Sequence, residues 1–183
     1  NPVYYIRRVP AYADLAALEA VLSENTFLRT ADLSLLYVYL CERAFNEGNK
    51  EDFLRWAPNV TTNQVINVAG AEAPIFRSYA SVVTGLIHYD RPADANHLIS
   101  QMKNPINRSS LYAFASNNFL LNNKNVDKVD ALLDSSNAEM KRATDLKAGQ
   151  PNRILIAYSL VLQNQEKNLM EAYATIKNLK YKS

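Results

Sequence analysis

Cysteine and glycine are both scarce in this 183-residue chain, which has one Cys and four Gly. A single cysteine, Cys41, excludes an internal disulfide and a zinc site built from several cysteines. Cys41 lies in an apolar stretch with helical spacing, so we expect it in the core. Because tight β-turns use glycine, the scarcity of glycine favours helices over hairpin-rich sheets.

Long hydrophobic runs are also missing, since no stretch approaches the roughly 18 apolar residues of a membrane-spanning helix. We therefore expect no membrane span. The chain begins at Asn1 without a methionine, which is compatible with a processed form or a fragment. We expect an intracellular protein of the cytoplasm or of the mitochondrial or another organellar matrix.

The sequence carries none of the common signatures of catalysis. No phosphate-binding glycine loop and no nucleophile elbow is present, and His88 and His97 lack the spacing of metal ligands. The chain is therefore expected to bind no metal or cofactor and not to be an enzyme. An alternative is a helical enzyme or regulatory domain whose catalytic partner lies outside this sequence.

Apolar residues recur at three- and four-residue steps along most of the chain, and no segment alternates as a strand does. The sequence predicts an all-α fold with an extended arm at 1–10 and one helical-repeat domain at 11–183. Two helices are expected within 74–103. The other expected helices are 14–24, 33–45, 51–57, 62–69, 107–122, 126–134, 136–147, 153–165 and 168–179. The segment 136–147 is mostly polar, which indicates a surface helix.

Four helical hairpins can be aligned at their turns, with steps of 42, 34 and 43 residues between Gly48, Asp90, Lys124 and Lys167. The fifth residue after each turn is apolar: Phe53, Ala95, Val129 and Ala172. The ninth is also apolar: Ala57, Ile99, Leu133 and Ile176. One hairpin cannot bury both of its faces, so successive hairpins stack. We therefore predict a short right-handed solenoid of stacked helical hairpins.

The apolar spacing of the segment 79–102 is set by Leu86-Ile87, Ala95, Leu98-Ile99 and Met102. With this spacing, the segment resembles a tetratricopeptide or pentatricopeptide repeat. The tetratricopeptide resemblance implies binding of a protein or peptide in a concave groove. The pentatricopeptide resemblance implies RNA, but the positions that would face bases are apolar and cannot hydrogen-bond to them: Val38, Ala80, Phe114 and Ala157.

Polar residues occupy the late positions of the first helix in each hairpin, on the side that lines the groove in tetratricopeptide-like stacks. We predict that they bind a partner: Glu42, Asn46, Thr84, His88, Asn118, Asn122 and Gln165. Simple solvation near a turn is the other interpretation. The function expected is that of an interaction scaffold, adaptor or assembly subunit. The alternative is a pentatricopeptide-like RNA-binding or organellar factor, although the net charge of +2 is low for one.

Aromatic residues are expected in two roles. Trp56 should anchor the core of the first hairpin. Half of the tyrosines on long helices should be buried and the rest should form a contact surface. These tyrosines are Tyr37, Tyr39, Tyr79, Tyr112, Tyr158 and Tyr173. The seam of the last hairpin is predicted to comprise Ala157, Leu160, Val161, Met170, Tyr173 and Ile176.

Overall fold

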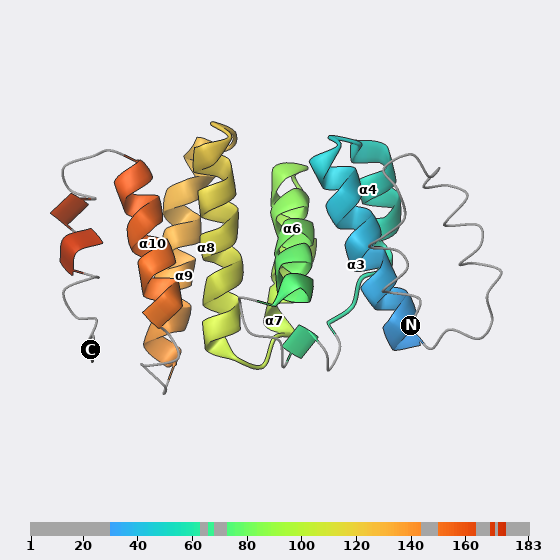
Figure 1. The fold of residues 1–183 in the computed structure, drawn as a ribbon, viewed down its shortest axis with the longest axis horizontal. Helices are drawn as coiled ribbons and strands as arrows, with labels where there is room; N and C mark the ends of the chain where they lie inside the picture. The colour runs from blue at the N-terminus through green and yellow to red at the C-terminus, as the bar shows by residue number, and fades with distance from the viewer. Residues whose placement is uncertain are drawn as a thin grey trace. The chain divides into compact units, whose positions relative to one another are not determined.

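The computed structural model describes residues 30–62, 66–67, 73–143, 150–163, 169–170 and 172–174. All regular structure in these ranges is helical, so the all-α prediction is confirmed (Figure 1). The predicted arm at 1–10 and the predicted helix at 14–24 lie outside the described residues. The chain forms two compact units, an N-terminal unit Asn1–Asp90 and a C-terminal unit Arg91–Ser183. The expectation of one domain over 11–183 stays a prediction.

The N-terminal unit is built on helix α3, which packs against α4 and α6. Gly48 ends the first hairpin turn with a φ of 71°, the left-handed conformation that glycine adopts without strain. Asn49 then caps α4, because its side chain accepts a hydrogen bond from the backbone N–H of Asp52. The elements of this unit are α3 (Thr30–Asn46), α4 (Lys50–Trp56), the 3₁₀ helix η1 (Ala57–Asn59) and α6 (Pro74–His88).

Four large aromatic side chains fill the core of the N-terminal unit and are completely buried: Phe53, Trp56, Phe76 and Tyr79. Burial of Cys41 and of Trp56 confirms the two core positions predicted from sequence. Gly85 is needed here because a Cβ atom at this position would lie 2.5 Å from Cζ of Phe53. Close approach of α6 to the Phe53 ring therefore depends on the absence of a side chain.

The C-terminal unit is built on α8, which packs against α9 and α10. Asn104 caps α8 by accepting a hydrogen bond from the N–H of Ile106. Asn123 and Asn125 both adopt left-handed φ values in the turn that follows α8, a conformation that asparagine tolerates well. The elements are α7 (Pro92–Ser100), α8 (Pro105–Leu121), the 3₁₀ helix η2 (Val126–Lys128), α9 (Val129–Arg142) and α10 (Gln150–Leu162).

Helix α9 corrects one sequence prediction, because the expected helices 126–134 and 136–147 are joined in a single helix that begins at Val129. No proline or glycine separates the two segments, so nothing stops the helix. The polar part, expected at the surface, exposes Ala138, Lys141 and Arg142 but buries its other side. Ser136, Glu139, Met140 and Ala143 are buried at three- and four-residue steps.

Two buried polar residues of α9, Ser136 and Glu139, are paired with residues of α8. The Ser136 hydroxyl donates to the backbone carbonyl of Ser109 at 2.9 Å, and the two serine hydroxyls are also 2.9 Å apart. Glu139 accepts from Arg108 at 2.8 Å and from Arg142 at 2.7 Å. These pairs allow serine and glutamate to face the core of a helix pair without unsatisfied donors.

The positions aligned in the four hairpins are buried wherever the structure describes them. Phe53, Ala95, Val129 and Ala172 are buried at the fifth position. Ala57, Ile99 and Leu133 are buried at the ninth, and Ile176 lies outside the described residues. Burial at these positions is thus as expected, whereas the repeat itself stays a prediction.

Candidate partner-binding surface

The polar residues predicted to bind a partner differ in their access to solvent in the N-terminal unit. Asn46 is exposed at the last residue of α3, and Glu42 is half-buried one turn earlier. Thr84 is buried in α6, where its hydroxyl donates to the backbone carbonyl of Ala80 at 2.7 Å. Because its hydrogen bond is satisfied within its own helix, we leave Thr84 out of the candidate set.

His88, the fourth predicted residue of this unit, belongs to a cluster of aromatic rings. Its ring centroid lies 4.8 Å from that of Tyr89 and 5.9 Å from that of Phe45. Phe53 contacts both Phe45 and Tyr89, and the Lys50 ammonium lies 5.8 Å from the Tyr89 ring centroid. Burial raises the pKa of the Tyr89 hydroxyl above its ordinary value. The rings of this cluster pack on one another.

In the C-terminal unit, Asn118 is half-buried and Asn122 is exposed at the C-terminal cap of α8. The side-chain amide of Asn122 donates to the backbone carbonyl of Asn118 at 2.8 Å, a carbonyl that also accepts the backbone N–H of Asn122. Gln165 lies outside the described residues. The geometry of Asn122 thus agrees with a capping role as well as with a binding role.

The most exposed apolar surface lies elsewhere, on α10. Ile154, Tyr158 and Val161 are 46%, 48% and 45% exposed, and their spacing places them on one side of the helix. We call these three residues the open face of α10. Ile156, Ala157 and Leu160 on the other side are buried, and α10 packs against α8. Among the described residues, α10 is therefore apolar on two sides, and its cover comes from the side toward α8.

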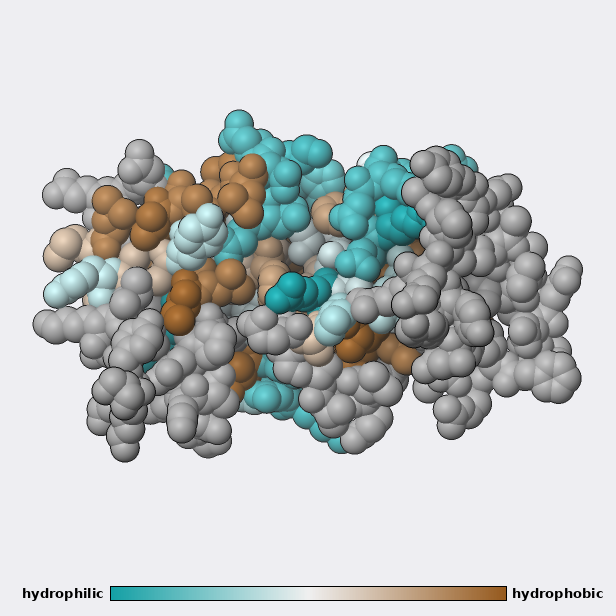
Figure 2. All heavy atoms as spheres, in the orientation of Figure 1, coloured by the Kyte–Doolittle hydropathy of each residue, from teal (hydrophilic) through white to brown (hydrophobic). Residues whose placement is uncertain are grey.

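Further exposed apolar side chains belong to the same unit: Leu121, Val126, Leu169, Met170 and Tyr173. Figure 2 shows hydrophobic atoms gathered over the part of the molecule that Figure 1 labels α10. Among the residues that the structure describes, no large apolar side chain of the N-terminal unit is comparably exposed. An apolar surface of this kind typically marks a site of protein association.

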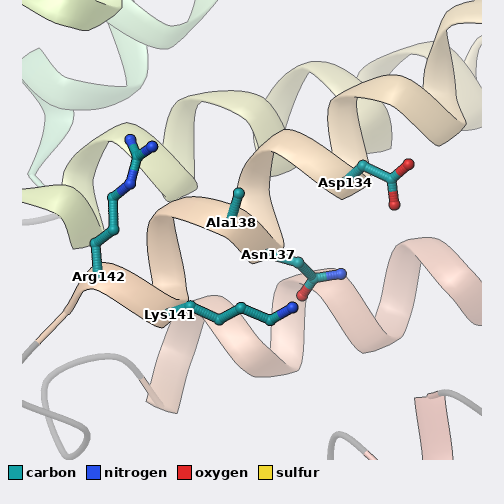
Figure 3. A pocket seen from close by; sticks show the side chains of 5 residues that line it. All are labelled: Asp134, Asn137, Ala138, Lys141 and Arg142. Atoms are coloured by element: carbon teal, nitrogen blue, oxygen red, sulfur yellow. The ribbon is translucent and has the colours of Figure 1, made fainter.

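A polar hollow of about 550 Å³ lies along α9 and is lined by Asp134, Asn137, Ala138, Lys141 and Arg142. Asn137 and Lys141 extend toward the ribbon of α10, whereas Arg142 extends in another direction (Figure 3). At its other end α9 is joined to α10, because the Gln163 side-chain amide donates to the Asp130 carboxylate at 2.8 Å. Helix α10 therefore has a polar and charged neighbour in α9.

Charge is distributed unevenly along α10. Asp130 lies beside the C-terminal end of this helix through its bond with Gln163. The only charged residue within the α10 sequence is Arg153, near the N-terminal end. Lys141 lies eleven residues after Asp130 on α9 and so is displaced toward that basic end. Asp134 lies between Asp130 and Lys141 on α9 and lines the same hollow as Lys141, so acidic and basic groups are not confined to opposite ends.

Sequence reasoning missed this surface because it placed Val161, Met170 and Tyr173 in the seam of the last hairpin. Val161 is half-exposed, and Met170 and Tyr173 are 67% and 63% exposed. Ala157 and Leu160 are buried as expected, and Ile176 lies outside the described residues. A useful signal was available, since eight apolar residues in α10 are more than one buried stripe requires.

The tyrosines predicted to divide between core and surface do so unevenly. Tyr79 is completely buried, Tyr37, Tyr39 and Tyr112 are half-buried, and Tyr158 and Tyr173 are exposed. Burial raises the pKa of the Tyr112 hydroxyl, and the nearby Glu139 carboxylate raises it further. Tyr158 is the tyrosine of this group that occupies the centre of the open face.

Neither a metal site nor a membrane span emerges from the described ranges. No three His, Cys, Asp or Glu residues in them are grouped as metal ligands would be. None of their helices combines the length and apolarity needed to cross a bilayer.

Comparison of the chain with family models, with curated proteins and with solved structures found no match. The function must therefore be inferred from the geometry of the described residues.

Proposed function

We propose that this chain is a protein–protein interaction module, a scaffold, adaptor or assembly subunit, which binds its partner through the open face of α10. One observation carries the proposal: within the described part of the chain, α10 is apolar on two sides and only the side toward α8 is covered. Complete burial of such side chains is worth roughly 1.5–3 kcal/mol each. Covering three half-exposed side chains would therefore contribute roughly 3 kcal/mol to association.

The architecture proposed for this module is the right-handed solenoid of stacked helical hairpins. Two features support it, namely the pairing of α3 with α4 and of α8 with α9, and burial at the aligned positions Phe53, Ala95 and Val129.

Sequence-specific RNA binding is the weaker alternative. Of the four positions that would face bases, Val38, Ala80 and Ala157 are buried and Phe114 is half-buried. Apolar residues that are buried cannot form the base contacts on which RNA recognition depends. A binder of the phosphate backbone would lose affinity steeply with added salt, so retention on RNA that falls with salt would favour this alternative.

The proposal is tested by capture of partners from a native lysate with three forms of the protein. Tyr158→Asp places a charge at the centre of the open face, and Ala93→Asp places the same charge on an exposed position of α7. We expect the wild type and Ala93→Asp to retain the same protein chain in stoichiometric amounts and Tyr158→Asp to lose it. Recovery of RNA alone, or equal capture by all three forms, would contradict the proposal.

A further inference from the structure

We propose that α10 is a separable helix, which opens from α8 more easily than α9 does because the contact between α8 and α10 contains a buried amide that lacks an adequate partner. The amide is the side chain of Asn117. The inference rests on the proposed function, because it concerns the regulation of the surface that α10 carries. It starts from the polar contacts that α8 makes with its two neighbours.

Asn117 lies on the side of α8 that faces α10. The residue is 6% exposed, and its Nδ2 atom lies 3.4 Å from the backbone carbonyl oxygen of Leu155 on α10. Its Oδ1 atom is buried and accepts no hydrogen bond from the residues that the structure describes. One half of this amide is therefore unpaired inside the C-terminal unit, where polar groups are normally satisfied.

The other half of the amide is paired weakly. The Leu155 carbonyl accepts the hydroxyl of Ser159 at 3.1 Å, and in a regular α-helix it also accepts the backbone N–H of that residue. A carbonyl oxygen has two lone pairs, so these two donors already use both of them. The Nδ2 donor of Asn117 comes third, at a distance longer than the roughly 2.7–3.2 Å of ordinary N–H···O bonds.

Turning the Asn117 amide by 180° does not remove the mismatch. Nδ2 would then take the place of the unpaired Oδ1, and Oδ1 would face the Leu155 carbonyl oxygen, which is another acceptor. In either orientation one atom of the buried amide lacks a partner. Opening of α10 would expose the amide to water, which can pair with both of its atoms, so the mismatch favours opening.

The contact of α8 with α9 is made with well-paired polar groups. The Ser136 hydroxyl lies 2.9 Å from both the hydroxyl and the backbone carbonyl oxygen of Ser109. Arg108 of α8 donates to the Glu139 carboxylate at 2.8 Å. Opening of α9 would break these bonds, whereas opening of α10 would relieve an unpaired group. The two helices that pack on α8 should therefore differ in opening free energy.

The described contacts that hold α10 in place are mainly apolar. Ile156, Ala157 and Leu160 are buried, and α10 packs against α8. The Gln163 side-chain amide donates to Asp130 at the surface, where water competes for both groups. Elements that bind partners are often drawn from the least stable part of a fold. Helix α10 would combine this low stability with the exposed apolar surface of the unit.

Native-state hydrogen exchange followed by mass spectrometry tests the inference. In the wild type we expect the backbone amides of α10 to exchange on the order of tenfold faster than those of α8 and α9, because they exchange through a separate opening. Asn117→Leu replaces the side-chain amide by an apolar group of similar size and should slow exchange in α10 about tenfold. Asn96→Leu, the same substitution at an exposed position of α7, should leave exchange in α10 unchanged.

Two results would overturn the inference. One is protection of α10 equal to that of α8 and α9 in the wild type, a measurement that does not depend on any variant. The other is unchanged exchange of α10 in Asn117→Leu protein whose circular dichroism is that of the wild type. Neither result bears on the proposed function, which fails instead if Tyr158→Asp captures the same partner as the wild type.

Discussion

The two units of the molecule are stabilised by different kinds of core. In the N-terminal unit Phe53, Trp56, Phe76 and Tyr79 are completely buried, and Gly85 makes room for one of these rings. In the C-terminal unit Phe119 is the only aromatic ring that is as deeply buried among the described residues, and serines take the remaining space. These buried serines are Ser109, Ser110, Ser116, Ser136 and Ser159.

This difference bears on where a partner can bind. Large rings bury much apolar area within a small unit, so the described part of the N-terminal unit exposes no large apolar side chain comparable to those of α10. Part of the interior of the C-terminal unit is filled by paired serine hydroxyls. Its described residues leave the open face of α10 exposed. The contrast predicts that stability is most sensitive to substitution in the first unit and association most sensitive in the second.

The largest loss of stability is expected for Trp56→Ala, because it removes a completely buried ring. Truncation of buried Phe or Trp to Ala costs about 3–5 kcal/mol. Trp56→Phe is the control: the indole N–H has no hydrogen-bond partner, so a smaller apolar ring should cost much less. Urea denaturation followed by circular dichroism measures both. Equal losses for the two variants would contradict the packing described for this core.

Gly85→Ala tests the close approach of α6 to Phe53. The added Cβ would lie 2.5 Å from Cζ of a ring that is itself completely buried, so overpacking should cost about 1–3 kcal/mol. Phe53→Leu shortens the side chain and should make Gly85→Ala less costly in the double variant than in the wild type. Additive effects in a double-mutant cycle would show that the two residues do not interact.

Ser136→Ala probes the contrasting core of the C-terminal unit. It removes the hydroxyl that pairs with Ser109 and should cost about 1–3 kcal/mol, because a buried partner is left unsatisfied. Ser109→Ala/Ser136→Ala removes both hydroxyls and should recover part of that loss. Chemical denaturation of the three variants and the wild type gives the comparison. A double variant less stable than both single variants would argue against a paired contact.

These serines also explain how far sequence reasoning could go. Helical periodicity predicted α6, α7 and α8 to within a few residues, and it placed Cys41 and Trp56 in the core, because apolar residues mark their own buried side. It failed for α9, where Ser136 and Glu139 are buried with partners from α8. Such partners are distant in sequence and have no local signal.

The candidate site shows a related limit. Sequence reasoning proposed partner-binding residues from their polarity; Thr84 is buried, and partner binding by the other residues stays a prediction. It assigned Val161 to a seam, because an apolar residue on a helix predicts burial by default. Which of two apolar sides remains uncovered depends on the number and placement of neighbouring helices. That information becomes available only with the tertiary structure.

The smallest effect is expected at Cys41. The fold should protect its thiol from chemical modification. Burial raises the pKa of the thiol far above its ordinary value and keeps it protonated. Native protein should therefore react very slowly with an alkylating reagent between pH 7 and 9, whereas denatured protein should react faster as the pH rises. Rapid alkylation of native protein would place Cys41 outside the core.

The central claim, that the open face of α10 is a protein contact, is tested most directly by photo-crosslinking from position 158. A photoreactive amino acid there should form a covalent adduct with another protein chain, which mass spectrometry then identifies, whereas the same group at position 93 of α7 should not. Adducts from position 93 alone, or adducts from position 158 only within the same chain, would contradict the claim.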